Sequence, residues 1–141
     1  MTPVRQAQDD DAMTIRRLVT ETLLAADLDA PTAEQDGDLV ELSYYREPGR
    51  GLWVAENDGG QVLGCVAIDR GDGGFAHLKR LAGAQLPELT AAAVAFAQGR
   101  GYAGVETVIP PSMAEARNAV QLEGFASDGD GNDLLFRKPL S

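Results

Sequence analysis

Two glycine-rich segments, residues 57–60 and 70–74, divide the middle of the chain into three runs of β-forming residues. The first segment reads Asn-Asp-Gly-Gly, and an Asp-Gly pair between such runs is a strong short-range signal for a hairpin. We therefore predict an antiparallel meander with strands at residues 52–56, 61–70 and 75–81.

Helical patterns lie on both sides of this predicted meander. Residues 11–26 carry an apolar stripe at helical spacing, and a shorter helix is expected at residues 38–45. The stripe consists of Ile15, Leu18, Val19, Thr22 and Leu23. After the meander, we predict helix, strand, helix and strand at residues 87–98, 105–109, 112–123 and 134–137.

A short strand at residues 4–8 completes the order of elements. This order predicts an α+β fold in which a mixed, mainly antiparallel central sheet is flanked by about four helices. A chain of 141 residues is long enough to bury one core, so residues 1–141 are expected to form a single domain.

Composition narrows the range of partners. The chain has 12 Lys and Arg against 22 Asp and Glu, a formal net charge of −10, which disfavours nucleic acid and anionic membranes. It has neither an apolar run of the roughly 20 residues that span a bilayer nor a secretory start, so a cytoplasmic location is expected. The single cysteine, Cys65, lies in an apolar run and is expected in the core.

Three phrases resemble the GNAT superfamily of acyl-CoA-dependent N-acyltransferases. They are HLKRL at residues 77–81, AAAVAFAQGRGYAGV at residues 91–105 and EGFASDGDGNDLLFRKPL at residues 123–140. The predicted order of elements also matches that family. The resemblance implies a GNAT-like fold, an acyl-CoA cofactor and an amine acceptor.

The family's pyrophosphate loop, Q/R-x-x-G-x-G/A at the start of the central helix, is not evident in this sequence. Alignment of the helix places residues 81–86 at the loop, where Gly83 alone fits the pattern. We expect the strand to turn almost directly into the helix, and acetyl-CoA binding to be lost or weakened. The alternative is a compact site at the bare helix N-terminus. If CoA binds, the resemblance implies contacts from Leu78, Lys79, Arg80, Leu81, Gly83 and Ala84.

Acylation of an amine needs a base for the ammonium proton and an acid for the departing thiolate. The family's base position, three residues before its Arg, holds His77, and its Tyr acid position holds Val120. His77 is therefore a possible base, although a strand histidine can equally have a structural role. Glu56 and Glu106 are weaker candidates, since a glutamate in a strand is usually solvated.

Aromatic residues suggest where an acceptor could bind. Tyr44 and Tyr45 could line an acceptor pocket, and because they are adjacent, one should be exposed and the other packed. Trp53 is expected in the core. Met113 occupies a position where the family often has Asn.

Two other motifs have simpler explanations. The G-x-G-x-x-G string at residues 99–104 follows a helix, the reverse of the order in a dinucleotide site, and is predicted to be a helix cap. Residues 128–133 look calcium-like but lack the distal Glu of an EF-hand, so we predict a solvated turn and no metal site.

Three functions are compatible with these observations. The first is a divergent GNAT-like protein that recognises a small molecule or a protein partner. The second is an active N-acetyltransferase with a shortened CoA site. The third is a structural subunit that forms a homodimer. The sequence leaves open whether the protein is an enzyme.

Overall fold

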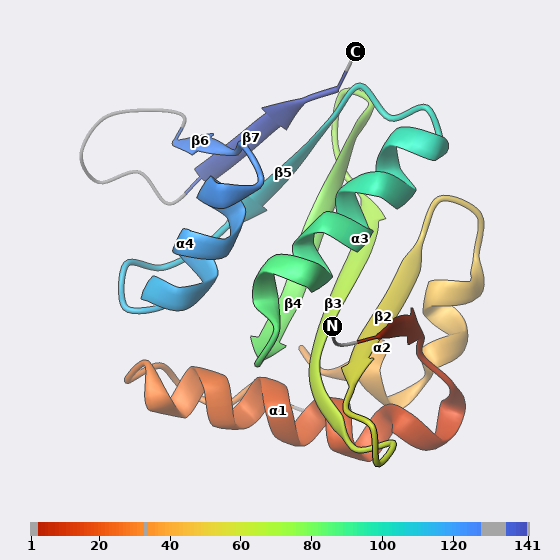
Figure 1. Cartoon of the computed structure of the whole chain (residues 1–141), viewed down its shortest axis with the longest axis vertical. Coiled ribbons are helices and arrows are strands. Elements are labelled where there is room, and N and C mark those ends of the chain that lie inside the picture. The colour runs from red at the N-terminus through yellow and green to blue at the C-terminus, as the bar shows by residue number, and fades with distance from the viewer. Residues whose placement is uncertain (1–2, 33, 128–134, 141) are drawn as a thin grey trace.

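The computed structural model describes residues 3–32, 34–127 and 135–140, and within them a seven-stranded sheet carries helices on both faces (Figure 1). The strands are β1 (Val4–Gln6), β2 (Gly51–Glu56), β3 (Val62–Arg70), β4 (Phe75–Gly83), β5 (Gly104–Val108), β6 (Ala126–Ser127) and β7 (Leu135–Pro139). The helices are η1 (Asp9–Asp11), α1 (Ala12–Ala25), α2 (Gly37–Val40), η2 (Leu42–Arg46), α3 (Leu86–Gly99) and α4 (Ala114–Leu122).

The sheet is mixed and mainly antiparallel, as the sequence predicts. Its strand order is β1-β2-β3-β4-β5-β7-β6, and β4 with β5 is the parallel pair among the described strands. These two strands pair only from Phe75 opposite Gly104 to His77 opposite Glu106. Beyond that point they diverge, β4 toward α3 and β5 toward α4 (Figure 1). The central parallel pair is therefore open over much of its length.

Each face of the sheet has its own apolar cluster. The first joins α3 and α4 to the sheet and includes Leu78, Leu89, Val105 and Val120, with Trp53 packed edge-on against Phe96 at 4.9 Å between ring centroids. The second lies under α1, α2 and η2 and contains Ile15, Leu39, Tyr45, Val54 and Cys65. Trp53 and Cys65 are thus core residues, as expected, and burial raises the pKa of the Cys65 thiol to about 12.

The helix expected at residues 38–45 is interrupted, which corrects that prediction. Helix α2 ends at Val40, Glu41 takes an extended conformation, and η2 begins at Leu42. A helix this short gains few backbone hydrogen bonds, so tertiary contacts decide its course. The predicted turn and calcium-like run at residues 128–133 lie outside the described residues.

A bulge in β4 changes which way its side chains point. Between the pairs Lys79 with Ala67 and Ala82 with Cys65, β4 has two residues and β3 has only Val66. Arg80 occupies the bulge with a φ of 60°, which is unusual for a residue other than glycine.

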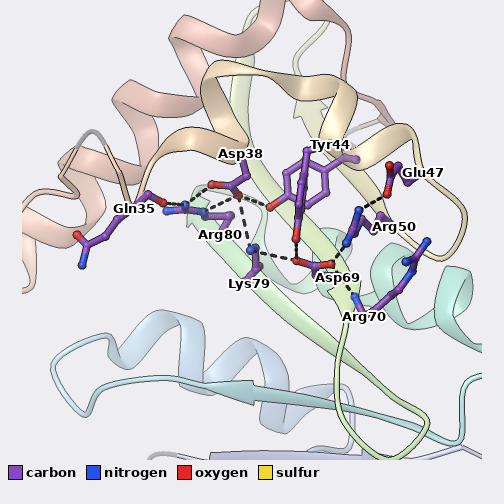
Figure 2. Close-up of polar contacts among 10 residues, drawn as sticks. Gln35, Asp38, Tyr44, Glu47, Arg50, Asp69, Arg70, Lys79 and Arg80 are labelled. Carbon is purple, nitrogen blue, oxygen red and sulfur yellow. Dashed lines mark hydrogen bonds and ion pairs between the residues drawn. The ribbon is translucent and has the colours of Figure 1, made fainter.

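The bulge breaks the alternation expected of a strand. Leu78 and Leu81 both join the cluster under α3 and α4, whereas strict alternation would pair Leu78 with Arg80. Lys79 and Arg80, although consecutive, both interact with the α2 side of the sheet (Figure 2).

Strand β4 meets α3 through only two residues, Ala84 and Gln85, in keeping with the short junction that we predict. Gly83 has a φ of 87°, and a Cβ atom there would lie 2.4 Å from the carbonyl oxygen of Leu63. Only glycine fits such a position, where the backbones of β3 and β4 are in close contact.

Candidate active site

A groove runs along the gap between β4 and β5. One part is a cavity of about 200 Å³ lined by His77 and Leu81 from β4, Thr107 from β5, and residues of α1 and α4. A second cavity of about 300 Å³ continues to Gly83 and Leu86 at the start of α3. Both cavities have Thr22, Leu81, Met113 and Ala116 in their walls, so we treat them as one β4–β5 groove.

His77 lies at the end of the groove where the two strands part. Its imidazole is partly buried, and burial, followed by the positive charge of Lys79, lowers its pKa below 6.5. A neutral imidazole is therefore the dominant form at pH 7. Within the described part of the chain, no side-chain hydrogen bond engages it. Of the two carboxylates paired with it across the sheet, Glu106 on β5 forms a 3.0 Å ion pair with Arg137, and Asp69 on β3 forms ion pairs with Lys79 and Arg50.

The point of divergence is fixed by one buried side chain. Thr107 on β5 donates a 2.8 Å hydrogen bond from Oγ1 to the carbonyl oxygen of Leu78 on β4. Thr107 is 3% exposed, so this bond is shielded from water. The bond joins the two strands one residue after His77, the last residue of β4 that pairs with β5. It satisfies the carbonyl of Leu78, which lies beyond that pairing.

The basic side chains beside the groove form ion pairs with carboxylates (Figure 2). Arg80 donates from Nη2 to Oδ1 of Asp38 at 2.6 Å and to the carbonyl oxygen of Gln35 at 2.6 Å. Lys79 Nζ lies 3.3 Å from Asp69 and 3.7 Å from Asp38. Their charges are therefore largely neutralised.

The two tyrosines support this network. Tyr44 donates to Asp69 and Tyr45 donates to Asp38, and their rings pack edge to face at 5.0 Å. Tyr45 is buried, as expected of one of the pair, but Tyr44 is half-buried rather than exposed because its hydroxyl is bonded to Asp69. Arg50 completes the group, with its guanidinium 4.1 Å from the Tyr44 ring centroid.

The same contacts set the charge of the two aspartates. Burial alone would raise the pKa of Asp69, but hydrogen bonds from Tyr44 and Arg50 outweigh it and lower the pKa to about 2. At Asp38, burial is likewise outweighed by hydrogen bonds from Arg80 and Tyr45, so its pKa also falls below the usual value. Both carboxylates are ionised at neutral pH.

The opposite end of the groove, at α3, is poor in positive charge. The residues that line it include Glu115 but neither Lys nor Arg. The first turn of α3 contains Pro87, which has no backbone N–H, and Glu88. The N–H of Gly83 is bonded to Thr22 Oγ1 at 3.2 Å, and that of Ala84 to the Leu63 carbonyl at 2.8 Å.

Solved structures with the same arrangement of elements are acetyltransferases. A GNAT-family acetyltransferase from Staphylococcus aureus Mu50 superimposes with a TM-score of 0.85 at 12% identity over 100% of both chains. An acetyltransferase from Streptococcus agalactiae has a TM-score of 0.82 at 18% identity, covering 99% of this chain and 98% of that one.

A putative acetyltransferase from Salmonella typhimurium, solved with its cofactor acetyl-CoA, has a TM-score of 0.80 at 18% identity. The match covers 100% of this chain and 95% of that one. The chain has the GNAT fold. No protein-family model and no curated protein sequence matches the chain.

Within this GNAT fold, the predicted cofactor-binding residues have different surroundings. The side chain of Leu78 is buried in the core, and Arg80 faces Asp38. Leu81 and Gly83 line the groove near α3, whereas Ala84 does not line it. Their predicted contacts with CoA stay predictions.

The predicted catalytic residues are also separated. His77 lines the groove, and Glu106 is paired with it from the neighbouring strand β5. Glu56 lies on β2, with its carboxylate 3.0 Å from Arg5. Val120, at the position of the family's acid, is fully buried and has no group that could donate a proton.

Three residues of the site were not predicted from the sequence: Asp38, Asp69 and Thr107. Asp69 lies near the end of the apolar strand β3, and a carboxylate at such a position is a signal for a partner across the sheet. Asp38 lies in the short helix α2 at the end of an acidic stretch, among similar residues, and carries no such signal.

Two further results concern the described residues only. They contain no cluster of His, Cys, Asp and Glu that could hold a metal ion. None of their helices combines the length and the apolar character that are needed to cross a membrane.

Proposed function

We propose that this protein is an N-acyltransferase that moves an acyl group from an acyl thioester of the CoA type to an amine. The observation that carries the proposal is His77, a neutral imidazole free of side-chain hydrogen bonds among the described residues, in the wall of the β4–β5 groove. A base with a pKa close to the working pH suits this role. The similar Salmonella protein was solved with acetyl-CoA, which supports a thioester donor.

In the proposed reaction, His77 takes one proton from the acceptor ammonium. The freed amine nitrogen attacks the thioester carbonyl carbon, so that a C–N bond forms and the C–S bond breaks. The nitrogen loses its second proton, and the departing sulfur is protonated through water because Val120 offers no acid. His77 then releases its proton to solvent. The products are an amide, a thiol and one proton.

Residues around the groove hold the reacting groups. Thr107 fixes the separation of β4 and β5 beside His77, and the apolar walls from α1 and α4 exclude water from the thioester. Tyr44 lies with Asp38, Glu34, Glu41 and Lys79 around a shallow hollow, where an acceptor ammonium would meet carboxylates. The proposed acceptor side is therefore acidic.

The test is a turnover assay with acetyl-CoA and a panel of primary amines, following release of free thiol and confirming the acetylated product by mass. Amine-dependent thiol release supports the proposal. Hydrolysis without amide formation, or no turnover with any amine, contradicts it. A calorimetric titration with acetyl-CoA shows separately whether the donor binds.

A second candidate function, recognition of a small molecule or protein without catalysis, is favoured by one observation. The groove end at α3 has Glu115 and no cation in its wall, and the first turn of the adjoining α3 contains Pro87 and Glu88. Under this hypothesis the titration with acetyl-CoA gives no heat at millimolar ligand. A homodimer stays a separate proposal, which sedimentation measurements test.

A further inference from the structure

The end of the groove at α3 has unusual chemistry for a donor that carries phosphates. Diphosphates bind to free backbone N–H groups, to positive helix ends and to cationic side chains. In this chain, the N–H groups of Gly83 and Ala84 are already bonded to Thr22 and Leu63. Pro87 has no N–H at all. These three residues therefore offer no free N–H donor to an anion.

Negative side-chain charge also disfavours an anion at this end of the groove. Glu88 lies in the first turn of α3, where its carboxylate cancels much of the positive helix dipole. Glu115, in the first turn of α4, lines the wall of the cavity at this end of the groove. A phosphate placed in this cavity would meet the Glu115 carboxylate and no cation in the wall, with Glu88 in the first turn of the adjoining helix.

The nearest basic side chains do not offset this repulsion. Lys79 and Arg80 line the other part of the groove, but Asp38 and Asp69 hold both of them. Arg80 is 15% exposed at its side chain, and moving it toward a phosphate would deprive buried Asp38 of its closest cationic partner. The formal net charge of −10 also repels an anionic ligand.

The groove itself suits an uncharged chain. Its walls are mostly apolar, with hydroxyl groups of Thr22, Thr107 and Ser112 at intervals. It follows β4 from His77 to Gly83, six residue steps or roughly 20 Å of extended strand. An acyl thioester on a slender amide-containing arm has the right chemistry to lie along it.

We propose that the donor is recognised by its acyl thioester and its uncharged pantetheine-type arm, and that the diphosphate and nucleotide contribute little. The inference rests on the proposed N-acyltransferase function. It identifies the donor class as acyl-pantetheine thioesters in general, of which acyl-CoA is one member. An acyl donor without phosphates should then serve as well as acetyl-CoA.

The test compares kcat/KM for acetyl-CoA and S-acetyl-pantetheine with the same amine, at low and at moderate salt. We expect the two values to agree within about threefold, because phosphates that contribute little binding energy, in the ground state or in the transition state, change kcat/KM little. An advantage of about 100-fold or more for acetyl-CoA overturns the inference and leaves the acyltransferase function intact. Absence of turnover with both donors overturns the proposed function, and the inference with it.

Glu88→Lys provides a gain-of-function check. Reversing this charge at the helix end is expected to raise kcat/KM for acetyl-CoA about three- to tenfold and to leave S-acetyl-pantetheine unchanged. Asp58→Lys, in the exposed turn between β2 and β3, makes the same change in net charge at a distance and should alter neither donor. An equal effect of Glu88→Lys on both donors, or no effect on either, contradicts the inference.

Discussion

Arg80 donates a 2.6 Å hydrogen bond from Nη2 to Oδ1 of Asp38, and this bond joins the bulge of β4 to helix α2. The Arg80 backbone has a φ of 60°, a conformation that costs a residue with a Cβ atom roughly 1–2 kcal/mol. Burial of the ion pair, with side chains 15% and 10% exposed, holds the arginine there. The same bond engages its guanidinium with a carboxylate, although Arg80 lines part of the groove.

Replacing Arg80 separates backbone strain from the ion pair. Arg80→Ala keeps the Cβ strain and removes the shortest ion pair of Asp38, which retains Tyr45 and the longer contact with Lys79, so the free energy of unfolding should fall by about 2–3 kcal/mol. Arg80→Gly loses the same ion pair but relieves the strain, and should be about 1 kcal/mol more stable than the alanine variant. Urea unfolding of both variants measures the difference. Equal stabilities would show that the bulge is unstrained.

The proposed base makes a clear prediction for His77. His77→Ala should lower kcat about 100-fold or more while changing the free energy of unfolding by less than about 1 kcal/mol. Glu56→Gln is the control. Glu56 on β2 pairs with Arg5 on β1, away from the groove, so this variant should keep full activity. Retained activity in His77→Ala removes the imidazole from the mechanism.

The pH dependence of the wild-type enzyme tests the same residue. The active form of His77 is neutral, and its pKa is lowered below 6.5 by burial and Lys79. With both substrates saturating, kcat should therefore rise with pH to a plateau that is reached near pH 7. An ascending limb centred above pH 7 would indicate a different base.

Asp69 should contribute to acid stability. Its pKa is about 2 in the folded protein, against an ordinary value of 3.8, so the stability it supplies is present above about pH 4 and is lost as the pH falls through 2. Asp69→Asn should lower the unfolding midpoint at pH 7 and make the midpoint less dependent on pH between 4 and 2. Thermal unfolding followed by circular dichroism measures both effects. If the unfolding midpoint of the variant depended on pH as steeply as that of the wild type, the ionised form of Asp69 would not be stabilised by folding.

Gly83 should tolerate no side chain. Gly83→Ala places a Cβ atom 2.4 Å from the Leu63 carbonyl at a φ of 87°, so we expect a loss of at least about 2 kcal/mol in the free energy of unfolding. Gly37→Ala in α2 has no atom within 4 Å of the new Cβ and should change stability by less than about 1 kcal/mol. Denaturant unfolding compares the pair. Similar effects of the two substitutions would contradict the close approach of β3 and β4.

Sequence by itself determined the elements whose residues interact locally. The meander followed from two glycine-rich turns, and α1 from an apolar stripe at helical spacing, because hydrophobic period and turn chemistry are properties of neighbouring residues. The resemblance placed His77 in the strand that lines the groove. The short junction before α3 was visible for the same reason, since it depends on the spacing along one segment.

Only the tertiary structure decided how the site is assembled. Asp38 and Arg80 are 42 residues apart, and no local pattern shows that they pair. The bulge breaks the strand alternation from which side-chain directions are predicted, so Arg80 faces Asp38 although alternation would place it beside Leu78. The groove likewise exists because β4 and β5 part after His77, where each strand follows a different helix. These features depend on contacts between distant segments, and such contacts form only when the whole chain packs.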